Sequence, residues 1–373
     1  MAPMIAGRAD AKGLDRYASK LAGRVSSEHF RELPGAGRIS SLGLGTYLGR
    51  EDAATDALYR KAVIRAVERG INVLDTAVNY RHQRSERLIG AALAELVSGG
   101  GAARDEIVVA TKGGFIALDA DVAQDPGAYF TETYLKPGIV RPDEVVGGAH
   151  CMTPKFLASQ IDRSRANLGL ETLDIYFLHN PETQLDEISR DEFLRRIRDA
   201  FRALEEAAAA GKIARYGTAT WNGYRAEPSE PGYLSLEAMV TTAREVGGPN
   251  HHFKVIQLPY NLAMPEAFTR ANQRIGAETV STLEAARRLG LYVMASASVY
   301  QGQLTRNLPG VIADYLPGWT SDAQRALQFV RSTPNIGTAL VGMKSLAHVE
   351  ENGEVARQAP VPWTEFKRLF AEA

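Results

Sequence analysis

Short apolar runs alternate with longer amphipathic stretches along most of the chain. The runs are rich in β-branched residues and have the length of buried strands, so each predicts one strand. The eight runs are residues 38–46, 71–77, 106–114, 172–180, 213–220, 253–262, 291–298 and 336–343. Between them, apolar residues recur at the three- and four-residue spacing of a helix face, most clearly over 57–70 and 191–212.

Local signals mark the ends of several predicted helices. Glycines stop helices just before the next strand at Gly70, Gly169, Gly211 and Gly290. Thr153-Pro154 and Ser321-Asp322 are typical of capped helix starts. Eight strands in strict alternation with eight helices predict a parallel sheet, and this number and the chain length favour a closed (β/α)8 barrel.

A doubly wound open sheet is the alternative architecture. Its dinucleotide fingerprint needs a glycine-rich turn, and the sequence GLGTYLG at residues 43–49 is the nearest match. The third glycine is misplaced, and no strand ends in an acid about 20 residues later. The barrel is therefore the better prediction.

The chain is interpreted as an N-terminal arm, residues 1–24, followed by a single domain, residues 25–373. A β-hairpin that turns at Gly35-Ala36-Gly37 precedes the first βα unit and is placed to plug the bottom of the barrel. Residues 115–152 form a long insert after the third strand, and loops of that length are usually lids or binding loops. We expect a lid that selects the substrate.

Composition narrows the class of ligand. The net charge is −1 and 45% of residues are hydrophobic, so there is no basic field for nucleic acid or for a membrane surface. The single cysteine, Cys151, cannot form an internal disulfide. Neither a signal peptide nor a run of about 18 apolar residues is found, so we expect a cytoplasmic protein that acts on a small molecule. The oligomeric state is not predicted.

Polar residues collect where the predicted strands end. The second strand ends in Asp75 with Tyr80 just beyond, the third ends in Lys112 and the fourth in His179, while the sixth carries Gln257. In a (β/α)8 barrel these strand ends meet at one mouth, where the chemistry of such barrels takes place. We expect Asp75 and Lys112 to pair, because neither charge is tolerated alone after an apolar run.

These residue types suggest proton transfer to a carbonyl oxygen. A lysine beside a phenol favours the phenolate, so we expect Lys112 to lower the pKa of Tyr80 and His179 to donate a hydrogen bond to a substrate oxygen. No side chain supplies hydride, which implies a nicotinamide cofactor. Each residue alone has a structural interpretation as a satisfied polar group, and their clustering favours function.

Two pairs of neighbouring residues, His251-His252 and His150-Cys151, contain side chains that can bind metals, but neither predicts a metal site. His251-His252 precede a strand at its N-terminal end, which favours a solvated loop. His150-Cys151 lie in the insert without further ligands, and we interpret them as loop residues. No metal site is predicted.

At the catalytic positions the sequence resembles the aldo-keto reductase family over roughly residues 30–357. Seven segments match in family order: LGLGTY, LDTAVNY, VATKGG, LDIYFLHNPE, GKIARYGTAT, VIQLPYN and GMKSLAHVEEN. The resemblance implies an NADP(H)-dependent oxidoreductase on a (β/α)8 barrel that reduces an aldehyde, ketone or keto-sugar, or oxidises the alcohol. In it Tyr80 is the general acid/base, and Asp75, Lys112 and His179 complete the tetrad.

The resemblance also implies a cofactor site. The residues it places beside the nicotinamide are Gly45, Thr46, Tyr47 and Gln257, and those beside the 2′-phosphate and adenine are Lys344, Ser345, Glu351 and Asn352. A lysine ahead of a helix N-terminus is by itself suited to an anion.

The sequence departs from the family pattern around the cofactor. Ala219 and Thr220 replace the Ser-Asn pair that holds the carboxamide, so Thr220 is expected to do part of that work. Ser296 stands where an aromatic residue often stacks on the nicotinamide, so this stacking is either lost or supplied by another residue, with Tyr300 as the candidate. His348 replaces an arginine at the 2′-phosphate. NADPH/NADP+ is the expected cofactor, and NADH stays open.

Two other functions remain open from the sequence. One is a redox-silent subunit that binds the cofactor and acts as a regulator. The other is an enzyme that keeps NADP(H) bound and catalyses isomerisation or dehydration without net redox. The intact tetrad argues against the first. The short tail after Asn352 leaves the insert 115–152 as the expected substrate-closing element.

Overall fold

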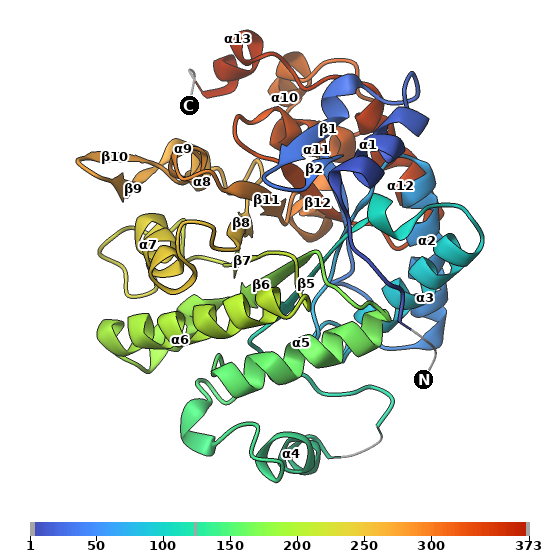
Figure 1. The fold of residues 1–373 in the computed structure, drawn as a ribbon. Helices are drawn as coiled ribbons and strands as arrows, with labels where there is room; N and C mark the ends of the chain where they lie inside the picture. Colours follow the sequence, from blue (N-terminus) through green and yellow to red (C-terminus); the bar gives the residue numbers. More distant parts are fainter. Residues whose placement is uncertain (1–3, 123–124, 371–373) are drawn as a thin grey trace.

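Eight parallel strands close into a barrel in the computed structural model, which describes residues 4–122 and 125–370. The strands follow the order β11-β12-β3-β4-β5-β6-β7-β8 around the barrel (Figure 1). They are β3 (Leu42–Gly45), β4 (Val73–Asp75), β5 (Val108–Gly113), β6 (Ile175–His179), β7 (Tyr216–Ala219), β8 (Phe253–Pro259), β11 (Tyr292–Ser296) and β12 (Thr338–Gly342). The predicted (β/α)8 barrel is confirmed, and the open sheet is excluded because β12 pairs with β3.

One main helix follows each barrel strand in the described part of the chain. These helices are α2 (Ala53–Glu68), α3 (Arg84–Ser98), α5 (Pro154–Leu168), α6 (Arg190–Ala209), α7 (Leu236–Gly247), α9 (Thr282–Arg288), α11 (Asp322–Ser332) and α12 (Leu346–Gly353). The predicted ends of two of them are confirmed. Ser321 caps α11 by accepting from the amide of Gln324 at 3.3 Å, and Gly169 ends α5 in the left-handed conformation.

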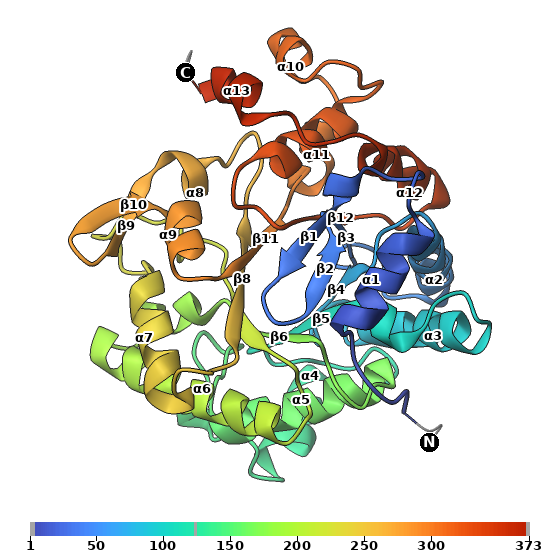
Figure 2. The ribbon, with the colours of Figure 1, turned by 45° about the horizontal axis from the view of Figure 1, so that its top comes forward.

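The predicted run 38–46 divides between two sheets. Its first part is β2 (Gly37–Ser40), which pairs antiparallel with β1 (Phe30–Leu33), and its second part is the barrel strand β3. The β1–β2 hairpin lies across the N-terminal end of the barrel (Figure 2). Its buried Leu33 and Ile39 belong to the same apolar cluster as Val73, Val108 and Met294 of the barrel strands. The hairpin therefore plugs the bottom of the barrel, as expected.

The N-terminal segment packs onto the same end. Helix α1 (Ala11–Lys20) buries Leu14 in the same apolar cluster as Leu33 and Ile39 of the hairpin. The amide of Ala9 donates to Asp174 at 2.7 Å, and Asp174 is also paired with the buried Arg104 at 2.7 Å. Because Asp174 lies directly before β6, this contact ties the segment to the floor of the barrel.

The insert 115–152 has a small core of its own. It contains the short helix α4 (Pro126–Phe130) and a π-helical turn from Thr131 to Leu135 (Figure 1). The buried Tyr129 and Tyr134 pack with Cys151 and with Phe156 of α5. These tyrosines thus form part of the core of the insert, and Cys151 is a buried loop residue.

The connection from β8 to α9 contains an addition that the alternating pattern does not predict. It runs through helix α8 (Glu266–Thr269) and the hairpin β9 (Ala271–Ile275) and β10 (Glu278–Ser281), which projects from the barrel in Figure 1. Two short helices, α10 (Gly310–Tyr315) and α13 (Trp363–Phe366), lie near the C-terminus. Among the described residues, no helix has the length and apolar composition needed to cross a bilayer.

Shortening a buried side chain of the β1–β2 hairpin is expected to destabilise the whole barrel. Leu33→Ala removes a fully buried side chain and should lower the free energy of unfolding by about 2–5 kcal/mol. The matched control Leu58→Ala, on the exposed face of α2, should change it by less than about 0.5 kcal/mol. Urea unfolding followed by circular dichroism measures both, and equal losses would contradict a plug that supports the core.

Candidate active site

An ion pair lies at the C-terminal ends of β4 and β5. Lys112 Nζ is 2.7 Å from Asp75 Oδ2 and donates to the carbonyl of Thr76 at 2.8 Å. The other carboxylate oxygen of Asp75 accepts from the side-chain amide of Gln257 at 2.8 Å. Both charged side chains are buried, so each needs the other to offset the cost of leaving water. The expected pairing is confirmed.

Tyr80 follows this pair, and its ring lies over the lysine. Lys112 Nζ is 4.9 Å from the ring centroid, within the range of a cation–π contact. Burial raises the pKa of the Tyr80 phenol well above its usual value, and the Asp75 carboxylate raises it further. The expectation that Lys112 lowers this pKa is therefore wrong for the protein alone, because desolvation dominates and Asp75 offsets the lysine charge.

His179 faces the same mouth from the end of β6. Its ring centroid is 5.8 Å from that of Tyr80. Burial lowers the pKa of His179 well below its usual value, and Lys112 and His150 lower it further, so the imidazole is neutral at pH 7. Its Nδ1 is buried without a hydrogen-bond partner among the described residues. A proton there would be an unpaired buried donor, which favours the tautomer with the proton on Nε2.

Aromatic rings surround the two candidate catalytic side chains. Tyr47 packs edge-on against Tyr80 with a centroid distance of 4.9 Å, and Phe115 packs edge-on against His179 at 5.1 Å. Tyr47 is 56% exposed and Trp221 is 40% exposed, which is unusual for large apolar rings. An apolar rim of this kind lowers the local dielectric and strengthens polar contacts inside it.

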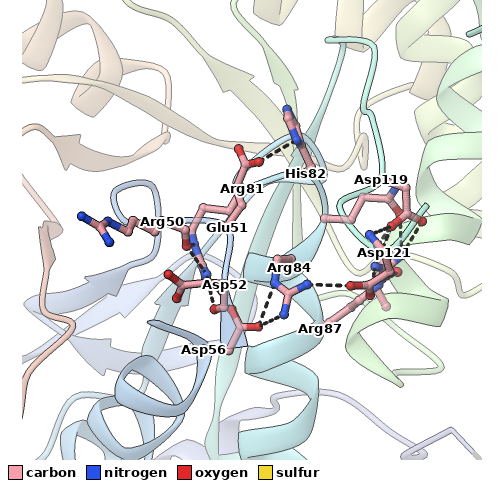
Figure 3. Close-up of polar contacts among 12 residues, drawn as sticks. Arg50, Glu51, Asp52, Asp56, Arg81, His82, Arg84, Arg87, Asp119 and Asp121 are labelled. Atoms are coloured by element: carbon pink, nitrogen blue, oxygen red, sulfur yellow. Dashed lines mark hydrogen bonds and ion pairs between the residues drawn. The ribbon is translucent and has the colours of Figure 1, made fainter. Parts of the chain in front are cut away.

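The backbone turns sharply beyond Tyr80. Arg81, His82 and Gln83 all have a positive φ, from +49° to +72°, a conformation that costs free energy for residues other than glycine. The buried guanidinium of Arg81 holds this turn, since it donates to the carbonyl of Arg50 at 2.8 Å and to Asp56 at 2.6 Å (Figure 3). These contacts connect the Tyr80 turn to the start of α2.

A second set of ion pairs joins α3 to the insert. Arg84 contacts Asp56 at 2.7 Å and Asp121 at 2.6 Å, and Arg87 contacts Asp119 at 2.7 Å (Figure 3). The network therefore links three connections around the mouth: the one before α2, the Tyr80 turn and the insert. A side chain that takes part in two ion pairs loses its conformational freedom only once. Such a network therefore stabilises the fold more than the same number of isolated surface pairs.

The residues expected at the nicotinamide lie in or near the C-terminal halves of four barrel strands. Gly45 ends β3, Thr220 follows β7 and Ser296 ends β11, while Gln257 in β8 uses its amide nitrogen on Asp75. Thr46 is fully buried, and its amide and hydroxyl both donate to the carbonyl of Asp75. The hydroxyl oxygen of Thr220 is buried without a partner among the described residues, which fits a polar ligand group there.

The residues expected at the phosphate and adenine lie between β12 and α12. Lys344 and His348 are exposed, and Ser345 caps α12 by accepting from the amide of His348 at 3.3 Å. Glu351 is partly exposed, and the side-chain oxygen of Asn352 is buried without a partner among the described residues. An exposed lysine at a helix N-terminus and this buried amide oxygen fit an anionic, hydrogen-bonding cofactor.

Sequence reasoning missed a buried carboxylate beside the mouth. Glu182 Oε1 accepts from the amides of Trp221, Asn222 and Gly223 at 2.6, 3.1 and 3.3 Å. Burial raises the pKa of Glu182, and the three backbone donors oppose the rise. It thereby holds the loop that follows Thr220. The available signal was an acid in the LHNPE segment, three residues after His179.

The histidine pair before β8 differs from its prediction. His251 is buried, and His252 lies 2.6 Å from Glu205, so this segment is packed on the barrel and is not a solvated loop. Within the described residues no group of three or more histidine, cysteine or acidic side chains is arranged to hold a metal ion.

Comparison with known proteins shows which family this chain resembles. The model of the aldo/keto reductase family matches residues 41–307. The NADH-specific methylglyoxal reductase of Escherichia coli K12 is 28% identical over 189 residues, which are 48% of this chain and 48% of that protein. The 6-dehydroglucose reductase of Novosphingobium aromaticivorans is 26% identical over 221 residues, 58% of this chain and 59% of that protein.

The chain thus spans about half the length of these curated relatives. Among solved structures, an aldo/keto reductase from Klebsiella pneumoniae in complex with NADP and acetate covers 92% of this chain, and the chain covers 95% of it. That pair has a TM-score of 0.61 at 21% identity, a likeness of fold.

Removal of one partner of the buried ion pair is expected to be costly. Lys112→Met leaves the Asp75 carboxylate without its cation and should reduce the free energy of unfolding by about 3–5 kcal/mol. Adding Asp75→Asn to Lys112→Met should restore much of this loss, because the uncompensated charge is gone. Urea unfolding measures the cycle.

The control for this cycle is Lys136→Met. Lys136 pairs with Glu132 on the surface, and its loss should cost less than about 1 kcal/mol. A double variant no more stable than Lys112→Met would show that the charge of Asp75 is not the source of the cost.

Proposed function

Since this chain belongs to the aldo/keto reductase family, we propose that it reduces an aldehyde, ketone or keto-sugar to an alcohol, or catalyses the reverse reaction, with NADP(H). The observation that carries this proposal is the convergence of Tyr80 and His179 on one barrel mouth above the Asp75–Lys112 pair. A neutral acid and a neutral hydrogen-bond donor beside one apolar rim are the groups that carbonyl reduction needs.

Bound NADP(H) supplies the hydride in this proposal. The phenol of Tyr80 gives its proton to the substrate oxygen, and His179 Nε2–H donates to the same oxygen and sets its direction. As the proton leaves, negative charge develops on the phenol oxygen. The buried ammonium of Lys112, 4.9 Å from the ring centroid, stabilises that charge.

The cofactor contacts are part of the same proposal. We assign the nicotinamide end to Gly45, Thr46, Tyr47, Thr220, Gln257 and Ser296. We assign the phosphate and adenine end to Lys344, Ser345, His348, Glu351 and Asn352. The buried oxygens of Thr220 and Asn352, which have no hydrogen-bond partner in the described part of the chain, support these two ends. Because His348 replaces an arginine and a relative is named as NADH-specific, both NADPH and NADH belong in the assay.

Substitution of Tyr80 by phenylalanine tests the proposal. With NADPH or NADH and a panel of aldehydes, ketones and keto-sugars, the unchanged protein should oxidise the reduced cofactor. Tyr80→Phe should lower the rate by about 10²–10⁴-fold, since it removes the proton donor and little else. Absorbance at the wavelength of the reduced cofactor measures the reaction.

The control for this assay is Tyr233→Phe, which removes a hydroxyl bonded to the carbonyl of Asn272 and should keep the full rate. Cofactor binding without turnover by any substrate would instead support a redox-silent subunit. Product formation with no net change of cofactor would support an isomerase or dehydratase.

The rate of reduction is expected to be independent of pH over a wide range. Burial holds the pKa of Tyr80 well above its usual value and that of His179 well below its usual value, so both groups stay neutral between about pH 7 and about pH 9. Single-turnover oxidation of NADPH, followed by stopped flow with saturating substrate, should be flat across this interval. A titration of the rate inside this interval would contradict the proposal that burial holds both groups neutral.

A further inference from the structure

The carbonyl of His179 is bonded to a side chain from the end of the insert. His150 Nε2 lies 2.7 Å from His179 O, and His150 is fully buried. The chain leaves β6 immediately afterwards, because Asn180 adopts a φ of +43°. His150 therefore contacts the backbone at the point where His179 is presented to the mouth.

The direction of this hydrogen bond follows from its neighbours. Arg196, a permanent donor, donates from Nη1 to Oε1 of Gln184 at 2.6 Å. The amide nitrogen of Gln184 must then face Nδ1 of His150, 2.9 Å away, and donate to it. Burial lowers the pKa of His150 to about 4, so the ring is neutral. Its one proton is on Nε2 and points to the carbonyl of His179.

The surroundings are shaped to allow this approach. Gly114 follows β5, and a Cβ there would lie 2.9 Å from His150 Nε2 and 2.9 Å from His179 O. Its φ of +143° also favours glycine. The ring of Phe115 is nearly perpendicular to both imidazoles, with centroids 5.0 Å from His150 and 5.1 Å from His179. A larger residue at Gly114 would push the two histidines apart.

The two ends of the insert also pair with each other. The amide of Ile116 donates to the carbonyl of Ala149 at 2.7 Å, and the amide of Cys151 donates to the carbonyl of Gly114 at 2.8 Å. His150 is therefore held from both sides along the backbone, in addition to its contact with Gln184. Because its own position is fixed, the side chain of His150 restricts the position of the carbonyl group to which it is hydrogen-bonded.

We propose that His150 is a positioning residue: the ordered chain Arg196–Gln184–His150 fixes the backbone of His179 and so aims the imidazole of His179 at the substrate oxygen. This inference rests on the proposed carbonyl reduction. It assigns to the insert the task of supporting His179 from behind. The task is distinct from closing over the substrate, since the contact is with backbone and lies in the packed interior.

The test compares His150→Phe with His150→Gln. Phenylalanine keeps a ring in the cavity but removes the donor, and the single-turnover rate should fall about tenfold to a hundredfold, as expected for a misplaced catalytic group. Glutamine can donate to the same carbonyl and should recover most of the rate. The dissociation constant for NADPH, from fluorescence quenching, should change by less than about twofold in both, because the cofactor is not misplaced.

A matched control loosens the insert elsewhere. Tyr134→Phe removes a hydrogen bond to the carbonyl of Ala117 in the insert core and does not touch His179. It should keep the rate of the unchanged protein. A loss equal to that of His150→Phe, or no recovery in His150→Gln, would overturn the proposal in favour of a general role of the insert in folding.

The tautomer of His150 is a separate readout that needs neither turnover nor a stable phenylalanine variant. Nitrogen-15 NMR of the histidine-labelled protein should show a neutral ring with the proton on Nε2, assigned among the seven histidines by its absence in His150→Gln. A proton on Nδ1 would overturn the proposal. If no carbonyl is reduced, the proposed function fails on its own, and this spectrum still decides the hydrogen-bond chain.

Discussion

The contact of 2.7 Å between Lys112 and Asp75 is the interaction on which the mouth of this barrel depends. A lysine and an aspartate that are buried among strands are tolerated only as an ion pair, with further hydrogen bonds to their remaining donors and acceptors. Gln257 from β8 and the carbonyl of Thr76 beyond β4 supply further hydrogen bonds to the pair. Since the pair joins neighbouring strands, it also fixes where the Tyr80 turn begins, and the rest of the site is arranged around that point.

Desolvation, more than charge, sets the protonation states in this mouth. Burial keeps the Tyr80 phenol and the His179 imidazole neutral, one by raising a pKa and the other by lowering it. The barrel floor contributes, because Leu33 and Ile39 of the hairpin fill the bottom and keep the interior apolar. In our proposal the charge of Lys112 stabilises the negative charge that develops on the phenol oxygen when a proton leaves Tyr80.

The insert after β5 supports the mouth at two places. On one side Asp119 and Asp121 pair with the arginines of α3 that follow the strained Tyr80 turn. On the other side His150 reaches the backbone of His179. Tyr129, Phe130 and Tyr134 of the insert pack among themselves and against Phe156 of α5, which gives the described part of the insert a small core of its own. A packed element holds catalytic groups in position more precisely than a loose loop does.

The sequence by itself determined the barrel, its hairpin plug and the Asp75–Lys112 pairing. Strand and helix periodicity is local, and a carboxylate after an apolar run needs a partner whatever the detailed packing. Only the tertiary structure decided the ionisation of Tyr80, the clamp of Glu182 on the loop after β7 and the hydrogen bond of His150. These depend on how deeply a group is buried and on which distant segments meet it. The spacing of residues along the chain indicates neither the depth of burial nor such contacts. Glu182 meets Trp221, and His150 meets Gln184, only when the barrel closes.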